Sequence, residues 1–164
     1  MGTSKASTPS AVDMLVALLD EGYDRRSWHG PNLRSSLRGI RPELACWRPG
    51  GDRHSIWELA AHAAYWKYVV RRRVRGEKRG RFPLTGSNFF PVPEPADASA
   101  WKGCLALLAD EHAKLRQTVT ALRDHDLVRT LGKDETVASL VRGAAAHDLY
   151  HAGQIRLIRR LRGS

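Results

Sequence analysis

Apolar residues recur at helical spacing in four long stretches of the chain. The clearest stretch covers residues 98–123, where intervals of four and three positions place one apolar stripe along a helix, formed by Trp101, Leu105, Leu108, His112, Leu115, Val119 and Leu122. Similar patterns predict helices at 11–27, 55–75 and 136–162. No stretch alternates in the way that predicts a confident strand, so the pattern indicates an all-α protein.

Capping residues support these helices. Ser10 and Asp13 have capping-box spacing, as do Ser55 and Glu58, and Thr136 is suited to cap the last helix. After residue 27 the first pattern is broken at 28–31 and continues briefly over 33–37, and residues 41–53 read as a loop.

The segment 76–97 contains three glycines and four prolines, so neither a helix nor a central strand can persist there. We therefore predict a four-helix bundle with a long Pro/Gly-rich crossover between the second and third helices. Two explanations of this loop stay open with equal weight: it borders a functional site, or it only joins distant helix ends.

A chain of 164 residues predicts a single domain, here residues 10–164 after a disordered tail at 1–9. Its hydrophobic fraction of 42% and charged fraction of 27% exclude intrinsic disorder, and a core of this size needs no metal for folding. Two cysteines without CxxC spacing indicate a reducing compartment. No apolar run is long enough for a signal peptide or a membrane span, so we expect a cytoplasmic protein without a membrane partner.

The net charge of +10 and the seven Lys or Arg residues between Arg71 and Arg81 raise the alternative of a noncatalytic basic protein that binds nucleic acid. No DNA-binding motif accompanies these charges. Basic residues near helix ends also interact favourably with the helix dipole and keep a surface solvated, and we prefer this interpretation. Sequence-specific nucleic-acid binding is therefore not expected.

Histidines occupy inward positions of two predicted helices. His147 and His151 lie one turn apart, and His62 on the second helix can supply a third nitrogen. Three neutral imidazoles with one open position are typical of catalytic zinc sites, and imidazole also suits nickel, copper and iron. The alternative is that these are hydrogen-bonded core histidines. His112 lies among leucines and fits that alternative better, so it is left out of the ligand set.

Two segments carry a family resemblance: residues 54–62 (HSIWELAAH) and 146–155 (AHDLYHAGQI). In this order, with a Trp-Arg-Pro loop at 47–49 before them, they resemble the signature stretches of the DinB-like, YfiT-related superfamily of metalloenzymes. The resemblance covers the chain from Ser10 onward. It implies a four-helix bundle and a divalent metal held by His62, His147 and His151.

From these observations we expect a metal-dependent enzyme, either a hydrolase or a transferase of a low-molecular-weight thiol, acting on a small-molecule substrate. Zinc or nickel is the expected ion. The thiol is implied by the resemblance alone. Gln154 and Tyr150 belong to the second segment and are candidates for hydrogen bonds that orient a ligand, although packing explains them equally well. The sequence leaves the oligomeric state open, a homodimer included.

Overall fold

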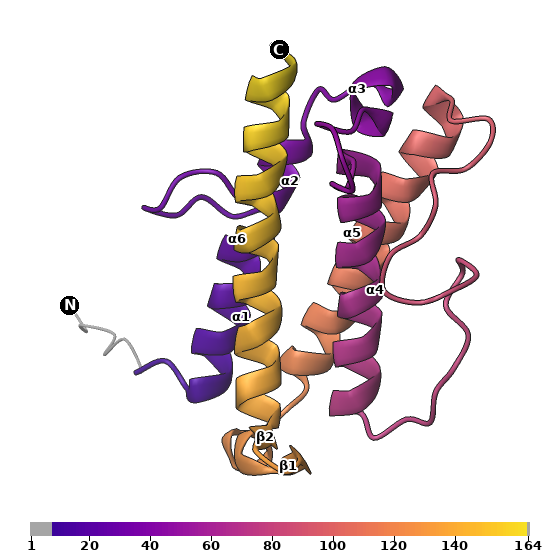
Figure 1. Cartoon of the computed structure of the whole chain (residues 1–164). Coiled ribbons are helices and arrows are strands. Elements are labelled where there is room, and N and C mark those ends of the chain that lie inside the picture. Colours follow the sequence, from indigo (N-terminus) through magenta and orange to yellow (C-terminus); the bar gives the residue numbers. More distant parts are fainter. Residues whose placement is uncertain (1–7, 164) are drawn as a thin grey trace.

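The computed structural model describes residues 8–163, and most of them are helical. Residues 1–7, most of the predicted tail, lie outside the described part. The helices are α1 (Ala11–Tyr23), α2 (Leu33–Leu37), α3 (Pro42–Cys46), α4 (Ile56–Val74), α5 (Ala98–Thr120) and α6 (Val137–Arg162) (Figure 1). A short 3-10 helix (Asp124–Val128) and the strands β1 (Thr130–Gly132) and β2 (Glu135–Thr136) lie between α5 and α6.

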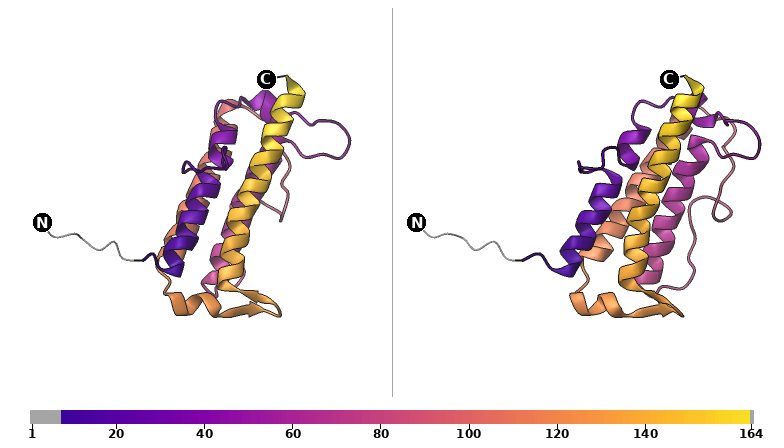
Figure 2. Two further views of the ribbon diagram at one scale, coloured as in Figure 1. Left: turned by 90° about the vertical axis from the view of Figure 1, so that its left-hand side faces the viewer. Right: turned by 60° about the vertical axis from the view of Figure 1, so that its left-hand side comes forward.

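The four longest helices lie side by side (Figure 2). Helix α4 packs against α5 and α6, and α1 packs against the same two helices from the other side. Residues 75–97 connect α4 to α5 along the outside of the molecule (Figure 1). This packing leaves α4 and α6 facing each other.

The predicted caps begin the long helices. The Ser55 hydroxyl accepts a hydrogen bond from the amide of Glu58, whose carboxylate accepts one from the amide of Ser55, so both halves of the capping box at α4 are present. The box at Ser10 and the cap at Thr136 are also confirmed. Local hydrogen bonds of this kind set where each helix begins.

Three details differ from the sequence prediction. Helix α1 ends at Tyr23 rather than at residue 27, because the backbone leaves the helical conformation at Asp24, with φ of −143°. Asn32, which caps α2, donates from its side chain to the carbonyl of Arg25 at 2.8 Å. The predicted loop 41–53 contains α3, whose Pro42 occupies a first-turn position where a missing amide hydrogen costs nothing. Strands β1 and β2 form a short antiparallel hairpin that the sequence pattern did not reveal.

Apolar side chains fill two clusters between the long helices. One lies around Trp57, Trp101 and Ile155, and the other around Leu19, Val119 and Val141. Cys46 and Cys104 form no disulfide. Among residues 8–163, no helix combines the length and the apolar character that crossing a membrane requires.

Gly22 permits a close approach of α1 to α6. A Cβ atom at this position would lie 2.9 Å from the carbonyl oxygen of Ala145, which is closer than real Cβ contacts allow. The contact is with backbone, so it can be relieved only if the two helices move apart. His147 lies two residues after Ala145 on α6. The size of the side chain at position 22 therefore affects where α6 and this histidine lie.

We expect Gly22→Ala to destabilise the protein by about 1–3 kcal/mol, because the added methyl group overpacks the helix interface. Gly103→Ala is the matched control: a Cβ there meets nothing within 4 Å, and alanine stabilises a helix interior by up to about 1 kcal/mol. Urea unfolding measures both. Equal effects of the two substitutions would contradict the proposed close approach.

Candidate metal centre

Three histidines from two helices meet between α4 and α6. His62 lies on α4, and His147 and His151 lie one turn apart on α6. The Nε2 atom of His147 lies 3.0 Å from Nε2 of His62 and 2.9 Å from Nε2 of His151. The potential ligand atoms of all three residues lie within 4.8 Å of one another. The structure thus brings together the three histidines that the sequence analysis named as ligands.

The Nδ1 atoms of two of these rings face outward and are hydrogen-bonded. His62 Nδ1 lies 2.9 Å from the carbonyl oxygen of Asn88, and His151 Nδ1 lies 2.6 Å from Oε1 of Gln154. These oxygens only accept hydrogen bonds, so each Nδ1 donates and each neutral ring has its lone pair on Nε2. The Gln154 amide nitrogen in turn donates to the Tyr150 hydroxyl at 3.2 Å. Both rings are therefore held with a free electron pair directed at the cluster.

Burial keeps the cluster uncharged. It lowers the pKa of His62 to about 4 and that of His147 to about 3, and it also lowers the pKa of His151. The neighbouring imidazoles lower the pKa of His147 further. At neutral pH the rings are unprotonated, which is the state in which imidazole binds a metal ion.

The three Nε2 atoms of the cluster carry too few hydrogens to pair with one another through hydrogen bonds. Nε2 of His62 and Nε2 of His151 both carry lone pairs, so only a hydrogen on His147 Nε2 could form a hydrogen bond in these two contacts. One N–H group points toward one acceptor, so the other contact would bring two lone pairs together. A divalent cation would instead accept all three lone pairs at once. Imidazole nitrogen is a usual ligand of zinc, nickel, copper and iron. The donor set therefore fits a divalent ion with three protein ligands.

The long segment between α4 and α5 covers one side of the cluster. The Phe89 ring stacks on His62 with centroids 4.1 Å apart and on His54 with centroids 3.6 Å apart. Trp66 donates from Nε1 to the side-chain oxygen of Asn88 at 3.0 Å, which holds the segment against α4. The segment 76–97 therefore borders the candidate site, and this favours the first of the two explanations that the sequence left open.

A cavity of about 430 Å³ opens beside the cluster. His62 and His147 form part of its wall, and Trp66, Val70 and Leu140 give it an apolar lining. The small residues Gly143 and Ala144 of α6 also border it. A volume of this size accommodates a small organic molecule.

A buried ion pair lies at the same cavity. The Lys67 ammonium group donates to Oδ2 of Asp148, and the two side chains are only 2% and 1% exposed. Burial raises the pKa of Asp148, whereas the ammonium group opposes this rise. The other carboxylate oxygen, Oδ1, has no hydrogen-bond partner among residues 8–163. The cavity thus combines apolar side chains with this buried ion pair.

The other histidines stay outside the cluster. His112 stacks on Tyr23 with centroids 3.8 Å apart, and burial lowers its pKa to about 3. His54 lies 3.6 Å from a carboxylate oxygen of Glu58 and contacts Phe89. Neither ring belongs to the group of potential ligands, and the same holds for His29 and His125.

Sequence reasoning missed four residues of the site. Nothing in the pattern indicated Phe89, and Asn88 carried only the weak signal that asparagine tolerates its left-handed backbone, with φ of 68°. Lys67 and Asp148 carried a stronger signal, since each occupies an inward position of its helix. A lysine between apolar positions on α4 and an aspartate beside His147 point to a buried partner for each.

In the metal-free protein, acidification should lower the free energy of unfolding. The unfolded histidines have a pKa near 6.5, against about 4 for His62 and about 3 for His147 in the fold, so between these values the unfolded chain binds more protons. The histidines contribute their full stabilisation above pH 6.5. As the pH is lowered below that value, the free energy of unfolding falls by about 1.4 kcal/mol per pH unit for each proton that the unfolded chain binds and the folded protein does not. Urea unfolding of chelator-treated protein measures this. His147→Gln removes one such group and should give a shallower curve; equally steep curves would refute the explanation.

Comparisons with known proteins assign the chain to a family. The model of the DinB superfamily matches residues 25–155, about four fifths of the chain. The match begins after α1, so it is shorter than the resemblance from Ser10 onward that the motifs suggested, but it contains both histidine segments. Comparisons with curated proteins and with solved structures give no match. The protein belongs to the DinB superfamily.

Proposed function

We propose that the protein is a metal-dependent enzyme whose divalent ion is held by His62, His147 and His151. The observation that carries this proposal is the convergence of three neutral imidazole nitrogens at the wall of a cavity of about 430 Å³. Structural zinc sites use four protein ligands, whereas catalytic sites use three and keep a position open to substrate. Membership of the DinB superfamily supports the same conclusion.

The finer description of the fold is part of this proposal. We infer that α1, α4, α5 and α6 form one four-helix bundle, that residues 75–97 are its crossover, and that residues 10–164 are one domain. The pairwise packing of the four helices supports this description. Helices that face each other in a bundle build metal sites from inward side chains, as α4 and α6 do here.

Each part of the site has a role in the proposed chemistry. A divalent ion bound by three imidazoles supplies Lewis acidity, which lowers the pKa of a water or a thiol. Asn88 and Gln154 orient two of the ligands through their Nδ1 atoms. Trp66, Val70 and Leu140 hold the apolar part of a substrate.

The two reaction classes that we propose are hydrolysis and transfer of a low-molecular-weight thiol, with zinc or nickel as the ion. Metal-loaded protein is assayed with aryl esters in the absence of thiol, and with a model electrophile in the presence of a panel of small thiols. We expect metal-dependent turnover in one assay and its loss in His147→Ala. Metal-independent turnover, or no turnover in both assays, would overturn the proposal of an enzyme of these classes.

Replacing any one of the three histidines by alanine should reduce bound metal at least tenfold, because two imidazoles bind a divalent ion much more weakly than three. His112→Ala should retain the metal. Metal content after purification without an affinity tag measures this, and circular dichroism confirms that each variant is folded. Full occupancy in His62→Ala, or equal loss in His112→Ala, would show that the ligands are wrongly assigned.

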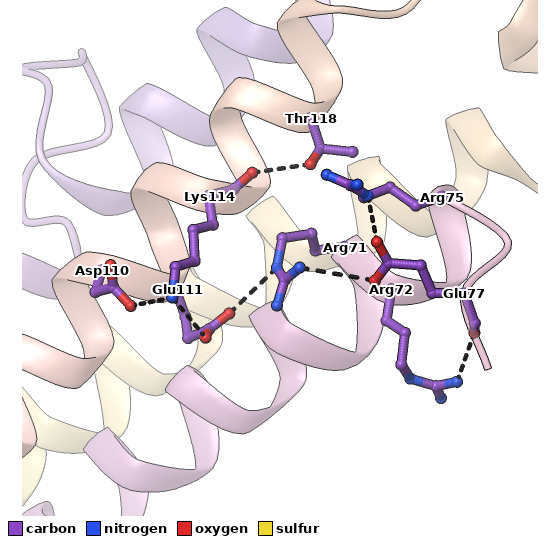
Figure 3. A network of polar contacts seen from close by, with 8 residues as sticks. All are labelled: Arg71, Arg72, Arg75, Glu77, Asp110, Glu111, Lys114 and Thr118. Atoms are coloured by element: carbon purple, nitrogen blue, oxygen red, sulfur yellow. Dashed lines mark hydrogen bonds and ion pairs between the residues drawn. The ribbon is translucent and has the colours of Figure 1, made fainter. Parts of the chain in front are cut away.

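The alternative of a nucleic-acid-binding protein is weakened by the ion pairs that part of the basic segment 71–81 makes within the protein. Arg71 lies 3.8 Å from Glu77 and 3.4 Å from Glu111, and Arg75 also pairs with Glu77 (Figure 3). Charges that are already paired within the protein have less to gain from phosphate groups.

Binding to duplex DNA should accordingly be weak, insensitive to base sequence and strongly reduced by salt. Fluorescence anisotropy at two salt concentrations, with random competitor DNA, measures this. Tight binding to one sequence in the presence of competitor at physiological salt would instead favour the nucleic-acid alternative.

A homodimer and a cytoplasmic location stay predictions.

A further inference from the structure

Three arginines of the basic segment are not used in ion pairs. Arg72, Arg79 and Arg81 make no ion pair with any residue among 8–163, in contrast to their neighbours Arg71 and Arg75. All three line one cavity of about 610 Å³ on the side of α4 that faces the segment 79–86. Among the described residues, those lining this cavity include no Asp or Glu. Three positive charges therefore surround one space without a counter-charge.

Two polar atoms at this cavity also lack partners. The hydroxyl of Tyr68 and the Nε atom of Arg72 are buried and make no hydrogen bond within residues 8–163. Tyr68 is only 8% exposed, so the cost of leaving its hydroxyl unsatisfied is not removed by bulk solvent. A Cβ on Gly80 would lie 3.1 Å from this hydroxyl, and the glycine therefore keeps the space beside it clear. Both residues line the cavity, so a ligand that reached these two donor groups would have to carry acceptors.

We propose that this cavity binds the phosphate group of a small phosphate monoester. A phosphate offers several acceptor oxygens, and arginine guanidinium groups match its geometry better than any other side chain does. The cavity is larger than a phosphate requires, and Tyr65, Val69 and Phe82 give the rest of it an apolar and aromatic wall. The organic part of the ligand therefore lies against aromatic rings.

This site is separate from the candidate metal centre. Its lining residues belong to other positions of α4 and to the segment 79–86, and none of them lines the cavity at His62 and His147. Helix α4 thus forms one wall of each cavity: Trp66 and Lys67 face the first, and Tyr68 and Arg72 face the second. Binding at the second cavity does not depend on the proposed enzyme activity.

Isothermal titration calorimetry of the full chain with adenosine monophosphate tests the proposal. Replacing both Arg79 and Arg81 by alanine should weaken binding at least tenfold, since hydrogen bonds to charged groups are lost. Tyr68→Phe keeps the ring and removes only the hydroxyl, so a loss of about fivefold is expected. Arg79→Ala alone should weaken binding at least threefold. Lys78→Ala is its matched control, because it removes one positive charge from the same exposed segment without lining the cavity, and its effect should stay below about twofold.

The same titration is repeated with His147→Ala, where unchanged affinity supports a site distinct from the histidine cluster. Loss of binding in that variant would place the phosphate at the cluster and overturn the proposal. Absence of saturable binding, equal losses in Lys78→Ala and in the double variant, or inorganic phosphate binding as tightly as the nucleotide would also overturn it. A single-stranded oligonucleotide that binds more tightly than the mononucleotide would identify a nucleic-acid surface instead.

Discussion

The ion pair between Lys67 and Asp148 is the contact on which the geometry of the candidate metal centre depends. Both side chains are almost completely buried, and separating them would leave an unpaired charge in the interior, at a cost of about 3–5 kcal/mol. Asp148 is adjacent to His147 on α6, and Lys67 lies little more than one turn after His62 on α4. The pair therefore sets the register of the two helices and with it the distances between the histidines.

The same ion pair connects all four long helices. The Lys67 ammonium group lies 5.1 Å from the centre of the Tyr23 ring on α1, and Tyr23 stacks on His112 of α5. A polar row thus crosses the interior through one residue of each helix: Asp148, Lys67, Tyr23 and His112. His112 has no role as a ligand, but its neutral ring completes this row, and the positive charge of Lys67 helps to keep its pKa low.

How much of the structure could be predicted from the sequence depends on how far apart along the chain the interacting residues lie. Helix starts depend on local pairs such as Ser55 and Glu58, and inward histidines at one-turn spacing depend on helix geometry alone, so both could be predicted. The contacts of Phe89 with His62 and of Asn88 with Trp66 join α4 to an irregular segment, between residues 22 or more positions apart. No periodicity describes such a segment, and only the folded chain shows which of its residues reach the site.

The carbonyl of Asn88 has a consequence for reactivity. Because this oxygen accepts the hydrogen on His62 Nδ1, it decides which nitrogen of the ring carries a lone pair. Trp66 holds Asn88, and Phe89 covers the same ring. Loss of this hydrogen bond would release the tautomer of His62 and weaken its affinity for an ion. The position of Asn88 and the strength of His62 as a ligand are thermodynamically linked, so an ion bound at Nε2 would in turn stabilise the contact between this carbonyl and the ring.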